Sequence, residues 1–149
     1  MKSRTKARGI ALQVLYETDI MGHPPGEVLT NRLEEEPLEE NLVEFCRQII
    51  FGVLPLVGKL DNFIAQHAPE WPLDQVAIID RNILRIALWE FAVEGCTPVK
   101  VAINEAIELA KIYGSDSTPR FVNGVLGSLA NRQNEIHQTF GSTSGPIDA

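Results

Sequence analysis

The spacing of the apolar residues constrains the fold more than any other feature, because they recur every three or four positions through most of the chain. In the segment 4–21, for example, Ala7, Ala11, Val14 and Leu15 fall on one side of a helix. This spacing gives a helix one apolar face for packing. The alternation typical of half-buried strands is sparse. We therefore predict an all-α protein.

Proline and glycine residues divide this pattern into about seven helices, some of them short. Pro55 lies inside the third segment and should bend it, because proline lacks a backbone donor and crowds the preceding turn. The tail 135–149 is rich in small and polar residues, so we expect it to be flexible and disordered. Residues 1–134 are then one helical domain, which suits a chain of 149 residues.

Positive charge is concentrated at the N-terminus. The chain has a formal net charge of −7, yet four of its 13 Lys and Arg residues, Lys2, Arg4, Lys6 and Arg8, lie in the first eight positions. The first acidic residue is Glu17. Such an arm is typical of proteins that bind a polyanion, although many basic arms serve only solubility.

A second basic region begins the last predicted helix, at TPRFVNG. Arg120 and Phe121 follow a helix start there, and no acidic residue occurs between Asp116 and Glu135. Free backbone amides and a guanidinium bind phosphate, and an exposed aromatic ring stacks on an unpaired base. A phenylalanine more often belongs to the core, but the two basic regions together favour binding to single-stranded nucleic acid.

The sequence offers no recognisable catalytic, metal or cofactor site, so we expect a protein that is not an enzyme. His23, His67 and His137 are far apart, and no metal-binding CxxC or HExxH spacing occurs. We expect Cys46 and Cys96 to be buried free thiols, since both have apolar neighbours. We expect no apolar run long enough for a membrane span and no secretory leader, and therefore a cytoplasmic protein.

Glu90 is unusual because it lies on an apolar helix face, one turn after Ile86. A carboxylate in that position needs a partner to offset its desolvation. We expect Arg85, Lys100 or Asn104 to provide it.

Four blocks of the sequence closely resemble the NusB family of bacterial transcription antitermination factors. They are RTKARGIALQVLYETD, DRNILRIALWEF, TPVKVAINEAIELAKIYG and PRFVNGVL, within a similarity that extends from about residue 4 to 129. The resemblance implies an all-helical fold of two packed three-helix subdomains without catalytic activity. It also implies binding to the boxA RNA of ribosomal RNA leader transcripts, jointly with the ribosomal protein NusE, within an RNA polymerase antitermination complex.

The same resemblance assigns roles to individual residues. Arg4, Lys6 and Arg8 would contact RNA phosphates, Phe121 and Asn123 would lie in an RNA-contacting segment, and Tyr16 and Asp80 would lie near the RNA and NusE surfaces. We add Lys111 and Arg120 as RNA-binding candidates for their charge and position.

Two alternatives remain open at this point. A domain similar to NusB occurs in ribosomal RNA cytosine methyltransferases, so the chain could be an RNA-recognition domain of that kind. It could also be a protein scaffold or homodimer in which the basic arm has no role in RNA binding.

Overall fold

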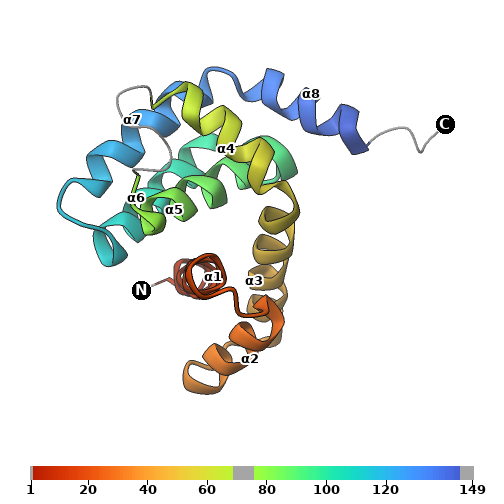
Figure 1. Ribbon diagram of the computed structural model, residues 1–149, viewed down its shortest axis with the longest axis vertical. Helices are drawn as coiled ribbons and strands as arrows, with labels where there is room; N and C mark the ends of the chain where they lie inside the picture. The colour runs from red at the N-terminus through yellow and green to blue at the C-terminus, as the bar shows by residue number, and fades with distance from the viewer. Residues whose placement is uncertain (1, 69–75, 145–149) are drawn as a thin grey trace.

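The computed structural model describes residues 2–68 and 76–144, and every regular element in these ranges is helical (Figure 1). The all-α prediction is therefore confirmed. The elements are α1 (Ser3–Met21), α2 (Pro25–Glu35), α3 (Glu40–Val53), η1 (Leu54–Leu56), α4 (Val57–Gln66), α5 (Ile78–Leu88), η3 (Trp89–Glu94), α6 (Val99–Tyr113), α7 (Thr118–Ala130) and α8 (Gln133–Ser144). Because α3, η1 and α4 follow one another directly, and α5 continues into the π-helical segment η3, the described residues form seven continuous helical stretches.

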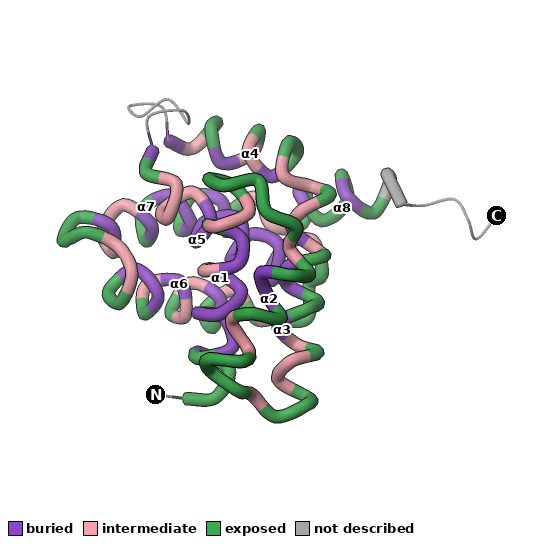
Figure 2. Tube along the Cα trace, turned by 60° about the horizontal axis from the view of Figure 1, so that its bottom comes forward, coloured by how far each residue is buried: buried purple, intermediate pink, exposed green. Residues whose placement is uncertain are grey.

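The helices form two packed groups of three, as expected. Helices α1, α2 and α3 make one group, and α5, α6 and α7 make the other, with α1 also packing on α5 and α6. Figure 1 looks nearly along α1, with α2 and α3 on one side of it and α5 and α6 on the other. The buried residues gather where these helices meet (Figure 2), and they form one hydrophobic core shared by both groups.

Arginine–carboxylate pairs hold α1 near both of its ends, and the pair near its start is buried. Near its start, Arg8 donates from Nε and Nη2 to the two carboxylate oxygens of Glu90, each over 2.8 Å. Near its end, Asp19 accepts a 2.9 Å hydrogen bond from Arg85 of α5, which also binds Asp61 of α4 through two nitrogens. These pairs join the two helical groups across their interface.

Our prediction of the residues that bind Glu90 was wrong. Its carboxylate binds Arg8 and accepts a 3.0 Å hydrogen bond from Thr97 Oγ1, and neither Arg85, Lys100 nor Asn104 is its partner. The reason is tertiary, since α1 packs against α5, which continues into η3, and thereby brings in an arginine 82 positions away.

The residues 40–66 make the one helical run in the described part of the chain that has the length and apolar content of a membrane span. We did not predict this run from the sequence, where we expected no apolar stretch of such length. Its inward residues, among them Ile50, Val53 and Leu60, are fully buried in the shared core, as in a core helix of a folded domain. A 3₁₀ turn, η1, occurs at Pro55, where we expected a bend.

The prediction for the C-terminal tail was wrong for residues 135–144. These residues lie in α8, which packs on η3, because Ile136 and Phe140 recur one turn apart and are buried. The centroid of the Phe140 ring lies 6.0 Å from the centroid of the Phe63 ring in α4. Residues 145–149 of the expected tail lie outside the described residues.

One of the two cysteine predictions was also wrong. Both thiols are free, and Cys46 is buried, but Cys96 is exposed because it lies in the connection between η3 and α6 rather than inside a helix.

Candidate nucleic-acid interface

The basic N-terminal residues begin a helix instead of forming a loose arm. Helix α1 starts at Ser3, and Lys2, Arg4 and Lys6 are exposed on and just before its first turn. The guanidinium carbon of Arg4 lies 4.6 Å from the ring centroid of Phe45 in α3. Three cations are thus accessible to a phosphate chain at one end of α1.

Arg8 does not belong to this exposed group, although we expected it to be an accessible cation of the basic arm. Only 4% of Arg8 is exposed, and besides its two bonds to Glu90 it lies 3.2 Å from a carboxylate oxygen of Glu105 in α6. Moving Arg8 out to a phosphate would leave two buried or nearly buried carboxylates without their cation, which is costly. Arg8 therefore holds α1 in place.

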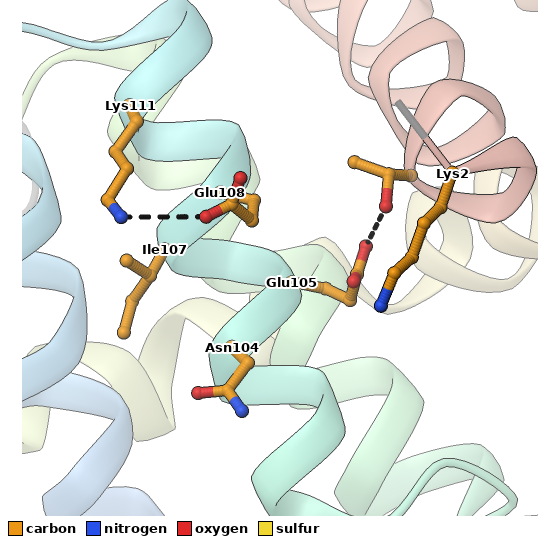
Figure 3. Close-up of a pocket in the computed structure, with 7 residues that line it drawn as sticks. Lys2, Asn104, Glu105, Ile107, Glu108 and Lys111 are labelled. Carbon is orange, nitrogen blue, oxygen red and sulfur yellow. Dashed lines mark hydrogen bonds and ion pairs between the residues drawn. The ribbon is translucent and has the colours of Figure 1, made fainter.

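The predicted cation Lys111 faces the same cleft as Lys2. The cleft has a volume of about 450 Å³ and lies between the start of α1 and α6 (Figure 3). Glu105 and Glu108 lie between the two lysines, and Lys111 forms an ion pair of 3.5 Å with Glu108. Since carboxylates occupy its middle, this cleft is a poor site for a phosphate.

The start of α7 presents a second exposed surface. Arg120 and Asn123 are exposed, whereas Phe121 is half-buried and packs partly against the core. Part of the Phe121 ring is therefore open to solvent. Helix α6 packs on both α1 and α7, so a strand that contacted Lys2 and Phe121 together would have to cross α6.

Asp80 and Tyr16 lie on different elements. Asp80, half-buried at the start of α5, accepts a 3.0 Å hydrogen bond from Thr118 Oγ1 of α7. Burial raises the pKa of Asp80, and the Thr118 hydrogen bond opposes this shift. Tyr16 is exposed on α1, about 15 Å along the helix from Lys6, and the exposed apolar residues Ile20 and Met21 follow it toward the end of the helix.

A second hollow, which we did not predict from the sequence, opens beside Arg4. It is formed by α3, η3 and the connection from η3 to α6, and two aromatic side chains line it, Phe45 and Trp89. The spacing of Phe45 in its helix predicts only a partly buried position, and nothing in the sequence places it next to Arg4. The described residues contain no group of His, Cys, Asp and Glu side chains suited to a metal ion.

Comparisons with known proteins agree with the resemblance in the sequence. The sequence profile of the NusB family matches residues 5–131. The chain is 48% identical over 134 residues to the transcription antitermination protein NusB of Roseiflexus castenholzii, an alignment that covers 89% of this chain and 94% of the relative. It is 49% identical over 128 residues to NusB of Dehalococcoides mccartyi, with 86% and 90% covered.

Solved structures have the same fold. NusB of T. maritima superposes with a TM-score of 0.81 at 28% identity, covering 92% of this chain and 98% of that one. A chain from the crystal structure of antitermination factors NusB and NusE in complex with dsRNA superposes with a TM-score of 0.78 at 25% identity, covering 93% and 98%. The two sequence relatives are antitermination proteins, which favours the RNA-binding interpretation over a methyltransferase domain.

Proposed function

The chain belongs to the NusB family of transcription antitermination proteins, which are not enzymes, and we propose that it binds boxA RNA of ribosomal RNA leader transcripts jointly with NusE. The observation that carries this proposal is the group of three exposed cations, Lys2, Arg4 and Lys6, at the start of α1. A similar fold occurs in a complex of NusB and NusE with RNA, which supports the same assignment. The site of action would be the bacterial cytoplasm, in the RNA polymerase antitermination complex.

The charge distribution suits a strand that is held at one place. The chain as a whole is acidic, with 20 Asp and Glu residues against 13 Lys and Arg. Its average field therefore repels nucleic acid, while the three cations attract phosphates to the start of α1. Binding should consequently be local and sensitive to salt.

The remaining candidates have distinct parts in this proposal. Arg120, Phe121 and Asn123 would contact RNA at the start of α7, and Lys111 would lie between the two surfaces. Tyr16 and Asp80 would face NusE or the RNA beside it. Arg8 contributes indirectly, because it fixes the helix that carries the three cations.

A gel-shift experiment with boxA RNA and a scrambled RNA of equal length tests the proposal. We expect the protein to bind boxA RNA more tightly than the scrambled strand, and NusE to strengthen only the boxA complex. Equal binding of both strands, with or without NusE, would contradict it.

A further inference from the structure

A small pocket beside the basic end of α1 has the properties of a binding site for one flat ring. Its volume is about 260 Å³, and its lining includes Arg4, Phe45, Gln48, Trp89, Glu94 and Thr97. Sites for drug-sized ligands begin at roughly 300 Å³, so this pocket suits a single ring system rather than a base pair.

The fold holds the aromatic walls of the pocket in place. Phe45, Gln48, Ile49 and Gly52 recur three and four positions apart and therefore share one face of α3. A side chain at Gly52 would overlap the indole ring of Trp89, so the ring lies directly against the helix backbone there. The guanidinium of Arg4 covers the Phe45 ring. Walls that are already ordered lose little entropy when a ligand binds.

The pocket combines flat surfaces with hydrogen-bonding groups. Aromatic rings and the planar guanidinium of Arg4 stack on bases, which are flat and present a polar edge. The Gln48 amide both donates and accepts hydrogen bonds, and the Glu94 carboxylate offers acceptor oxygens. A carboxylate also disfavours a phosphate at the same place.

We propose that this pocket receives one unpaired RNA base, while Lys2, Lys6 and the N–H edge of the Arg4 guanidinium bind the phosphates beside it. The proposal rests on the RNA-binding function proposed above and assigns it a subsite. Because the Glu94 carboxylate accepts hydrogen bonds, the preferred base is one with an exocyclic amino group that donates, which means adenine, cytosine or guanine rather than uracil.

Cys96 reports on the pocket directly. It is exposed and lines the pocket, whereas Cys46 is buried and burial raises the pKa of its thiol to about 12. N-ethylmaleimide should therefore alkylate Cys96 first in the folded protein, since the thiolate is the reactive form.

The first experiment measures the alkylation rate of Cys96 in the full chain with saturating boxA RNA, with NusE alone, and with neither. We expect RNA to slow the reaction at least tenfold and NusE alone to leave it unchanged. If RNA binds in a gel shift but the rate stays the same, the pocket proposal is wrong and the proposed function stands. If NusE alone slows the alkylation of Cys96, the pocket binds a protein side chain and the base proposal is wrong. If the protein does not bind RNA at all, both proposals are wrong.

A second experiment identifies the base. Abasic nucleotides are placed at each position of the boxA RNA in turn, and affinity is measured for the wild type, Phe45→Leu, and the control Phe51→Leu, which changes an exposed phenylalanine outside the pocket on the same helix. In the wild type and the control, one abasic position should weaken binding roughly 5- to 150-fold. In Phe45→Leu, an abasic nucleotide at the same position should weaken binding less than twofold. An equal penalty in all three proteins would overturn the proposal.

Discussion

At the scale of single residues, two arginines four positions apart in the same helix have different roles. Arg4 is exposed over an aromatic ring, whereas Arg8 is buried between Glu90 and Glu105. The sequence around them does not distinguish the two, because the carboxylates that bind Arg8 lie more than 80 positions away. Only the packing of α1 on α5 and α6 decides which cation remains free for a ligand.

Replacing Arg8 should destabilise the fold strongly. In Arg8→Ala the Glu90 carboxylate stays buried without its cation, so we expect the free energy of unfolding to fall by about 3–5 kcal/mol. The control Lys6→Ala removes an exposed cation from the same helix and should change it by less than about 0.5 kcal/mol. Urea denaturation measures both, and similar losses in the two variants would refute the structural role of Arg8.

Asp80 should make stability depend on pH. Burial raises the pKa of Asp80 in the folded state, so the folded protein binds a proton at this group more tightly than the unfolded chain does. Stability associated with this group is therefore present at low pH and is lost as the pH rises through its raised pKa. The Asp80→Asn side chain can still accept the hydrogen bond from Thr118.

We therefore expect Asp80→Asn to be at least as stable as the wild type at pH 7, with any advantage disappearing below about pH 4. Unfolding curves at both pH values check this, and the exposed Asp116→Asn is the control. A variant that is clearly less stable than the wild type at pH 7 would show that the ionised carboxylate stabilises the fold.

At the scale of elements, close contact between α3 and η3 builds the wall of the pocket beside Arg4. Trp89 of η3 lies on α3 at Gly52, where any larger residue would displace the ring. The helices themselves follow from the apolar spacing in the sequence. This contact does not, because an isolated glycine in a helical pattern does not reveal which side chain approaches it.

Gly52→Ala should destabilise the protein by about 1–3 kcal/mol, since the new methyl group overlaps the Trp89 indole. The matched control is Gly58→Ala in α4, where no atom lies within 4 Å of the added carbon. That change should stabilise the protein by about 0.4–1 kcal/mol, because alanine restricts the unfolded chain. Chemical denaturation of both variants tests the opposite signs, and equal effects would contradict the contact.

Helix α8 shows why composition misled the prediction for the tail. Small and polar residues dominate it, yet its apolar side chains Ile136 and Phe140 are buried against the rest of the fold. Gln133 and His137 add hydrogen bonds to two backbone carbonyls of η3. Ile136→Ala should cost about 2–5 kcal/mol, whereas the exposed Gln138→Ala should be nearly neutral. Thermal unfolding of both compares them, and a neutral Ile136→Ala would mean that α8 adds nothing to the core.

At the scale of the whole molecule, an acidic body carries its exposed N-terminal cations at one end of its central helix. The all-α class, the two three-helix groups and most helix positions could be predicted, because they depend on apolar spacing and on blocks shared with a family. The buried pairs, the pocket beside Arg4 and the docking of α8 could not, because each depends on residues that only the folded chain brings together.

The central claim is that Lys2, Arg4 and Lys6 bind RNA phosphates, and the salt dependence of boxA RNA binding tests it most directly. Three contacts on a single strand predict a slope of about −2 for log affinity against log salt. Lys6→Gln should reduce the slope to about −1.4, whereas Arg47→Gln, on the side of α3 away from Phe45, should leave it unchanged. A flat salt response in the wild type, or equal slopes for the wild type and Lys6→Gln, would contradict the claim.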